Sequence, residues 1–144
     1  MCEATVAAFE QADIAILCAA VADFTPCTTA DKKIKKQPGQ DGMVVELKTT
    51  TDIAATLGAS KQAHQRLVGF ALETHDEQAN ALRKLQSKNL DMIVLNSLQD
   101  QGAGFGVDTN KVTLLFADGT KKDLPLLLKQ EVADVIVESI LQLI

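Results

Sequence analysis

Four lysines, Lys32, Lys33, Lys35 and Lys36, fall within five residues of one segment. This segment follows an apolar run that ends at Asp23. Open α/β sheets bind their ligands beyond the carboxyl ends of the strands, so we expect these cations to lie where a ligand binds. Ammonium groups gathered at such an edge suit an anion such as a nucleoside triphosphate. The sequence therefore predicts part of a nucleotide-dependent active site.

The composition argues against a nucleic-acid ligand. The chain has five Phe, no Trp and no Tyr, and its formal net charge is −5. Binding along a polynucleotide would need a basic surface and more aromatic platforms for the bases. We therefore expect the lysines to form a local positive island that holds a small anionic ligand.

The cysteines and the hydropathy pattern indicate a cytoplasmic protein. Cys2, Cys18 and Cys27 show no metal-ligand spacing and no CxxC pair, as in a reducing compartment. No apolar run reaches the roughly 18 residues of a spanning helix, and the N-terminus lacks a secretory signal pattern. His64 and His75 have no partner pattern for a metal or for nucleophilic catalysis, so no protein metal site is expected.

Apolar runs alternate with amphipathic segments along the chain. Residues 14–21 form a continuous apolar run, typical of a strand buried on both faces of a parallel sheet. Further strands are predicted over 66–72 and 91–96. Helices are predicted over 3–11, over 53–65 with Gly58 as a weak point, over 76–88 with Ala79, Leu82 and Leu85 on the apolar face, and over 126–144.

Two antiparallel features accompany these units. Residues 111–117 and 121–124 flank Asp118-Gly119, a hairpin turn signal. Residues 43–48 alternate in polarity and are predicted to pair with 33–36 as a β-arm. The expected fold is therefore α/β: a Rossmann-like, doubly wound, mostly parallel sheet with an antiparallel edge hairpin and a β-arm flap.

The domain organisation is predicted to be a single domain over 1–144. A Rossmann-type unit usually opens with a strand and a Gly-rich phosphate turn. Because the sequence contains no such turn, we expect the chain to be the C-terminal portion of a domain that lacks its first βα units.

The segments that carry a family resemblance are, in chain order, Ala19–Phe24, Lys33–Lys36, Thr51–Ile53, Val68–Thr74, Lys84, Lys88–Asp91, Asn96 and Gly104–Gly106 with Asp108 and Asn110. In this order and spacing they closely resemble phosphopantothenoylcysteine synthetase, across essentially the whole chain. In bacteria that synthetase is usually the C-terminal domain of a bifunctional coenzyme A biosynthesis protein that also carries a flavin-dependent decarboxylase. The family's opening strand, its Gly-rich turn and an asparagine that supports the acyl-nucleotide intermediate have no counterpart here.

The resemblance implies a ligase reaction. 4′-Phosphopantothenate and CTP, with Mg²⁺, would give an acyl-cytidylate and pyrophosphate, and L-cysteine would then displace CMP to form 4′-phosphopantothenoylcysteine. Flavin would belong only to the decarboxylase domain. The resemblance also implies a homodimer, with the arm around 31–48 crossing to the partner.

The resemblance also assigns roles to residues, and it makes Lys33 the catalytic lysine of the flap. The residues matched to nucleotide binding are Asp23, Lys33, Thr51, Asp52, Ile53, Ala54, Phe70, Lys84 and Lys88, and those matched to substrate binding are Ala19 and Ala20. Each also has a purely structural interpretation: a solvated lysine, a turn at Asp23, helix capping at Thr51 and Asp52, or core packing for Phe70 and the alanines.

Two other classes of function stay open. One is an inactive nucleotide-binding or dimerisation fragment, which the missing asparagine and Gly-rich turn favour. The other is an unrelated NAD(P)-binding oxidoreductase. The glycines of 102–106 are not a dinucleotide fingerprint, because a strand rather than a helix follows, and they predict a mobile loop. The choice between CTP and ATP is open as well.

Overall fold

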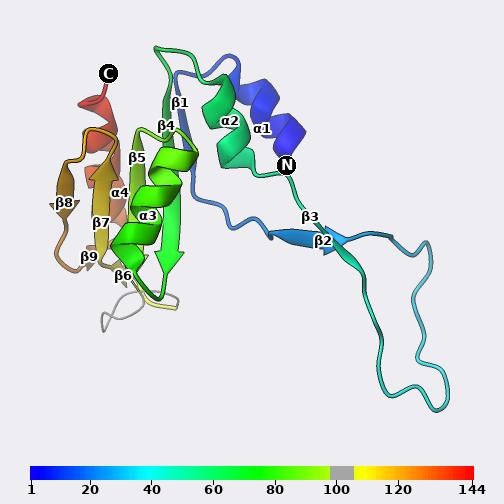
Figure 1. Cartoon of the computed structure of the whole chain (residues 1–144). Helices are drawn as coiled ribbons and strands as arrows, with labels where there is room; N and C mark the ends of the chain where they lie inside the picture. The colour runs from blue at the N-terminus through cyan, green and yellow to red at the C-terminus, as the bar shows by residue number, and fades with distance from the viewer. Residues whose placement is uncertain (98–105) are drawn as a thin grey trace. The chain divides into compact units, whose positions relative to one another are not determined.

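Figure 1 shows the computed structural model of the chain, which describes residues 1–97 and 106–144. These residues divide into two compact units: unit 1 comprises Met1–Cys18 with Ile53–Ile144, and unit 2 comprises Ala19–Asp52. All the buried apolar side chains found in the described residues belong to unit 1. Unit 1 therefore holds the folded core.

The centre of unit 1 is a five-stranded sheet. Its strands are β1 (Ile14–Leu17), β4 (Arg66–Glu73), β5 (Met92–Ser97), β7 (Val112–Phe116) and β8 (Lys121–Asp123), in the order β1-β4-β5-β7-β8. The first three are parallel, and β7 is antiparallel to both of its neighbours. Four of the five strands therefore run in one direction, which confirms a mostly parallel sheet with an antiparallel edge.

Helices cover both faces of this sheet, as Figure 1 shows. Buried residues of α1 (Cys2–Phe9), α2 (Ile53–Ser60) and α3 (Glu77–Ser87) pack with Leu67 and Ile93. Buried residues of α4 (Lys129–Leu141) pack instead with Val68 and Met92. Successive strand residues thus enter opposite cores, which explains the continuous apolar runs of β4 and β5 and confirms the doubly wound α/β class.

The predicted first strand is only partly correct. It was expected over 14–21 with both faces buried, but β1 ends at Leu17 and Ile16 is 41% exposed. In the described residues β1 pairs with β4 alone, at one end of the sheet order. An edge strand is covered less than a central one, so an apolar run does not by itself imply burial on both faces.

Two helix boundaries also differ from the prediction. The helix expected over 53–65 ends at Ser60, because Gln65 folds residues 62–65 into a turn and donates to the carbonyls of Phe9 and Ala12, each at 2.7 Å. The helix expected from 126 begins at Lys129, since β9 (Leu127–Leu128) pairs first with β6 (Thr109–Asn110).

The other predictions for unit 1 are largely confirmed. The first and third helices lie where they were expected, although Ala81 and Leu85 are the buried residues of α3 and Ala79 is exposed. The β7–β8 hairpin forms, with Gly119 at φ +88°. In the described ranges no helix combines the length and apolar character needed to cross a membrane.

Unit 2 contains a short antiparallel ladder between β2 (Phe24–Pro26) and β3 (Leu47–Thr49). The predicted pairing of 33–36 with 43–48 is wrong, because β3 pairs with β2 and Lys33–Lys36 form no strand. The Thr50 hydroxyl donates to the Ala22 carbonyl at 2.6 Å beside this ladder. Residues 28–39 are all exposed, so there is no buried face to hold a longer ladder in register.

Candidate functional site

A polar cluster surrounds the carboxyl end of β4 in unit 1. Glu73 is the last residue of β4, and its Oε1 accepts a hydrogen bond from Lys84 Nζ at 2.6 Å. The same contact is an ion pair. The Glu73 side chain is 13% exposed, whereas that of Lys84 is 45% exposed. The pair therefore joins a mostly buried carboxylate to a half-exposed ammonium at the edge where such sheets bind ligands.

Asn80, on the first turns of α3, links this pair to its surroundings. Its side-chain amide donates to the His75 carbonyl at 2.8 Å and, at a longer 3.4 Å, to Glu73 Oε2. Arg83 donates to Asn80 Oδ1 at 2.6 Å. Lys84 and Arg83 are thus tied to Glu73 and Asn80, and these two cations and one anion leave a net charge of +1, which favours an anionic ligand over a cationic one.

Two further polar residues quoted in the family resemblance meet in unit 1. Asn110 Nδ2 donates to Asn96 Oδ1 at 2.9 Å, and both side chains are half-buried. Asn96 lies next to the last residue of β5, so this contact also belongs to the carboxyl edge of the sheet. Of the glycine-rich segment quoted with them, Gly104 and Phe105 lie outside the described residues, as does most of the mobile loop predicted over 102–106. Gly106 is described and has φ +75°.

The other predicted residues of unit 1 occupy different environments. Ile53 is buried in the core at the start of α2, so only its backbone is available to a ligand, and Ala54 beside it is half-buried. Phe70 was expected at the end of its strand, but it lies within β4 opposite Val94 and packs against the α4 core. Lys88 caps the C-terminus of α3.

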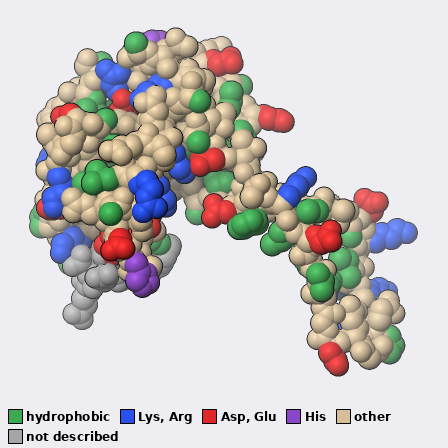
Figure 2. All heavy atoms as spheres, in the orientation of Figure 1, with side chains coloured by type: hydrophobic (Ala, Val, Ile, Leu, Met, Phe, Trp, Pro, Cys, Tyr) green, Lys and Arg blue, Asp and Glu red, His purple; other side chains and the backbone are tan. Residues whose placement is uncertain are grey.

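Six of the eleven predicted residues belong to unit 2, namely Ala19, Ala20, Asp23, Lys33, Thr51 and Asp52, and all six are exposed. The Asp23 carbonyl accepts from the Thr50 amide at 2.9 Å. The Asp23 carboxylate and the Lys33 ammonium form no hydrogen bond or ion pair with any residue the structure describes. Figure 2 shows apolar and charged side chains interspersed along this unit.

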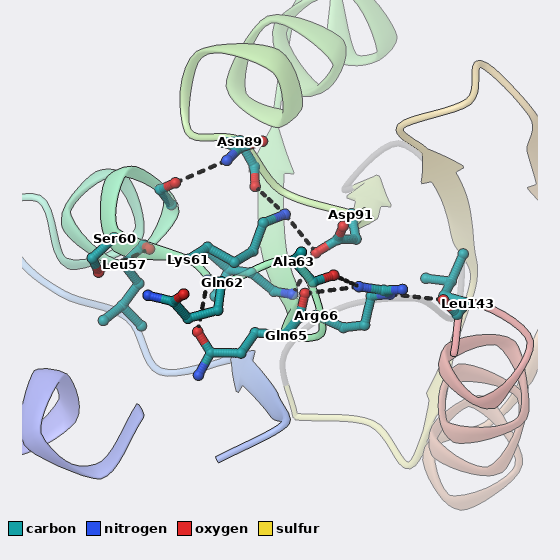
Figure 3. A network of polar contacts seen from close by, with 12 residues as sticks. Leu57, Ser60, Lys61, Gln62, Ala63, Gln65, Arg66, Asn89, Asp91 and Leu143 are labelled. Carbon is teal, nitrogen blue, oxygen red and sulfur yellow. Dashed lines mark hydrogen bonds and ion pairs between the residues drawn. The ribbon is translucent and has the colours of Figure 1, made fainter. Parts of the chain in front are cut away.

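A second ion pair, absent from the sequence analysis, lies at the opposite end of the sheet (Figure 3). Lys61 Nζ donates to Asp91 Oδ2 at 2.8 Å and to the Asn89 carbonyl at 2.9 Å. Asp91 Oδ2 also accepts from the Leu67 amide at 2.7 Å. Because this network joins the amino ends of β4 and β5, away from the ligand edge, we assign it to stability.

The sequence analysis singled out Lys84 but not its ion-pair partner Glu73. Glu73 stood inside a matched segment, yet nothing in the sequence indicated its partner eleven residues away. The only available signal was an acidic residue that follows an apolar strand and precedes a helix.

Among residues 1–97 and 106–144, no three His, Cys, Asp or Glu side chains gather as a metal site would require. A magnesium ion that arrives on the phosphates of a nucleotide needs no such cluster.

Comparison with curated proteins gives two close relatives. A cysteine/cysteine sulfinic acid decarboxylase from an unknown prokaryotic organism is 57% identical over 144 residues, which is 100% of this chain and 40% of that protein. The coenzyme A biosynthesis bifunctional protein CoaBC of Bacillus subtilis (strain 168) is 51% identical over 140 residues, 97% of this chain and 34% of that protein. The chain thus spans well under half the length of either relative.

Solved structures share the fold. The crystal structure of the C-terminal domain of CoaBC matches with a TM-score of 0.74 and 38% identity, covering 96% of this chain and 58% of that one. A mutant of Cab2 in complex with phosphopantothenate-cysteine matches with a TM-score of 0.59 and 22% identity, over 87% of this chain and 43% of that one, which shows a common fold. The DNA/pantothenate metabolism flavoprotein C-terminal domain matches residues 1–144, so the resemblance expected from the sequence is confirmed and the chain belongs to that family.

Proposed function

We propose that this chain provides the phosphopantothenate–cysteine ligase activity of coenzyme A biosynthesis. The family match over the entire chain carries this proposal, and a relative named for coenzyme A biosynthesis at 51% identity supports it. A protein of the same fold has been captured with phosphopantothenate-cysteine, which is the product such a ligase would make. Because the chain belongs to this family, we no longer consider the alternative of an unrelated NAD(P)-binding oxidoreductase.

The proposed reaction has two steps. A carboxylate oxygen of 4′-phosphopantothenate attacks the α-phosphorus of CTP, and pyrophosphate leaves to give an acyl-cytidylate. The amine of L-cysteine then attacks the activated carbonyl, loses a proton and expels CMP as the new amide forms. The protein's contribution is to position the reactants and to neutralise their charge.

In unit 2 we assign the chemistry to Lys33. Its exposed ammonium is available to a triphosphate or to the departing phosphate of the acyl-cytidylate. Asp23 would accept hydrogen bonds from an exocyclic amine or a ribose hydroxyl of the nucleotide. Ala19 and Ala20 would admit the substrate through their small size and their backbone groups.

The remaining proposed contacts come from the start of α2 and from unit 1. Residues 51–54 span the start of α2, where backbone N–H groups can donate hydrogen bonds to a ligand oxygen or to the edge of a base. Lys84 would hold a phosphate, and Lys88 would add a second positive charge. Phe70 would shape the nucleotide position from within β4.

Several properties complete the proposal. CTP is the nucleotide, Mg²⁺ is bound through its phosphates, the protein is a cytoplasmic homodimer, and flavin is confined to the decarboxylase part of larger relatives. The decarboxylase name of the 57% identical relative belongs to a protein of which this chain matches 40%. The decarboxylation for which that relative is named therefore need not involve the residues present here.

Isothermal titration with CTP and with ATP, both in Mg²⁺, tests this function. We expect heat selective for CTP, and at least about tenfold weaker binding in Lys33→Ala, since a lost charge-assisted contact costs about 1.5–3 kcal/mol. Lys48→Ala, which removes an exposed lysine from β3 of the same unit, should bind CTP as the wild type does. A folded chain that binds neither nucleotide would contradict the proposal, and an N-terminally extended chain would then show whether added residues restore binding.

A further inference from the structure

The cluster at the carboxyl end of β4 contains an acid to which the proposed ligase reaction assigns no role. Glu73 offers a carboxylate that is 13% exposed and lies 2.6 Å from the ammonium of Lys84. A charged carboxylate that is largely removed from water is stabilised by a cationic partner. The ion pair is therefore a built feature of unit 1 rather than a chance contact between two surface side chains.

The geometry constrains Lys84 as much as Glu73. A lysine side chain has many rotamers, and ordering it opposes ligand binding. An ammonium that is already paired at the edge of the sheet has lost that freedom before any nucleotide arrives. Its three N–H donors leave capacity for a phosphate beside the bond to Glu73.

Asn80 keeps the acid in place. Its amide group bonds the His75 carbonyl at 2.8 Å and reaches Glu73 Oε2 at 3.4 Å, while Arg83 holds Asn80 Oδ1 at 2.6 Å. The carboxylate is thus contacted at one oxygen by Lys84 and at the other by Asn80. The strong bond to Lys84 and the weaker contact with Asn80 together limit the directions in which the carboxylate, and with it the ammonium, can point.

We infer that Glu73 is a positioning residue that holds Lys84 ready for a nucleotide phosphate, an inference that rests on the proposed function. Lysine–glutamate pairs are used in this way in protein kinases, where the lysine contacts ATP phosphates only when a glutamate orients it. The opposing effect is repulsion between Glu73 and the incoming phosphate. The Lys84 ammonium at 2.6 Å offsets this repulsion, and we expect positioning to be the larger effect.

A double-mutant cycle tests the inference. CTP binding in Mg²⁺ is measured by isothermal titration for the wild type, Glu73→Gln, Lys84→Gln and the double variant. We expect Glu73→Gln to bind CTP about tenfold more weakly, and Lys84→Gln at least as weakly. The double variant should bind no more weakly than Lys84→Gln alone, because Glu73 acts through Lys84. In turnover, Glu73→Gln should raise the KM for CTP and leave kcat at saturating CTP unchanged.

Two controls separate positioning from folding. Asp123→Asn breaks an exposed ion pair with Lys121 in the same unit and should leave CTP affinity unchanged. Glu73→Asp keeps the negative charge but shortens the side chain by one methylene. Its affinity for CTP should lie between that of the wild type and that of Glu73→Gln. This graded series remains informative if Glu73→Gln proves unstable.

The outcomes are distinguishable. A wild type that binds CTP, with a Glu73→Gln variant that binds it equally well or more tightly, overturns this inference and leaves the proposed function standing. Losses that simply add in the double variant also overturn it, because they mean that Glu73 acts independently of Lys84. A wild type that binds no CTP overturns the proposed function and this inference together.

Discussion

At the scale of single residues, two lysine–carboxylate pairs lie at opposite ends of β4. Glu73 and Lys84 meet at its carboxyl end with Lys84 half-exposed, whereas Lys61 and Asp91 meet at its amino end with side chains 11% and 20% exposed. Parallel sheets bind ligands at the first location and not at the second. We therefore expect the same chemistry to support ligand binding at one end and stability at the other.

The largely buried Lys61–Asp91 pair leads to a prediction about the effect of Asp91→Ala on stability. The change leaves the Lys61 ammonium and the Leu67 amide without the oxygen that each contacts now. We expect the free energy of unfolding to fall by about 2–3 kcal/mol, as for other polar groups left without a partner. Urea denaturation followed by circular dichroism measures this. Asp123→Ala, which removes an exposed pair, should change stability far less, and equal losses in both variants would contradict the assignment.

The hairpin between β7 and β8 gives a pH-dependent prediction. Hydrogen bonds from the hydroxyl and the amide of Thr120 hold the pKa of Asp118 below its ordinary value of 3.8. A lowered pKa stabilises the folded state above about pH 4, and that contribution is lost as the pH falls through the folded-state pKa. In Thr120→Val the hydroxyl is gone, so the pKa of Asp118 should rise toward 3.8. The carboxyl chemical shift of Asp118, followed through an NMR titration, measures this pKa. Identical titration midpoints in the wild type and in Thr120→Val would show that the Thr120 hydroxyl does not lower it.

At the scale of elements, β4, β5, α3 and the β7–β8 hairpin could all be predicted, because apolar periodicity and a turn signal lie within each segment. The ends of β1 and α2 could not be predicted in the same way. Gln65 ends α2 by bonding carbonyls more than fifty residues away in the sequence, and such partners leave no local pattern. The pairing of β2 with β3 could not be predicted either, because it depends on where the exposed segment between them turns back.

The contact between α2 and α3 reverses an ordinary expectation for Gly58. Replacing a glycine in a helix with alanine usually stabilises by about 1 kcal/mol. Here an added Cβ would lie 1.9 Å from the Lys88 carbonyl oxygen, and backbone cannot move aside as a side chain can. We therefore expect Gly58→Ala to destabilise unit 1 by about 2 kcal/mol or more. Gly42→Ala, at a position with nothing within 4 Å, should change the thermal midpoint little. A raised midpoint in Gly58→Ala would show that the close approach does not exist.

At the scale of the whole molecule, the α/β class could be predicted from the sequence because strand and helix patterns alternate along it. The family could be predicted because ordered motifs such as Val68–Thr74 carry the resemblance. The pairing of Lys84 with Glu73 could not, since it depends on how the ten residues between them fold back along β4. Nor could the division of the chain into two units, because residues 19–21 continue the apolar run of β1 in sequence but belong to unit 2.

The exposed apolar side chains of unit 2 lead to a prediction about assembly. Val44 is 92% exposed, Ile34 is 62% exposed and Met43 is 57% exposed, which is costly in a monomer and is expected of an interface between two copies. Light scattering should therefore give twice the chain's mass of 15.4 kDa.

Replacing Met43 and Val44 together with Asp should weaken the dimer by about a hundredfold or more, because burying two such side chains contributes about 3 kcal/mol and the added charges repel across the interface. The pair Thr28→Asp with Thr29→Asp adds the same charge at exposed polar positions of the same unit, and it should leave the mass unchanged. A wild type that stays monomeric at high concentration would rule out this interface, and equal dissociation in both double variants would assign the effect to charge rather than to the apolar side chains.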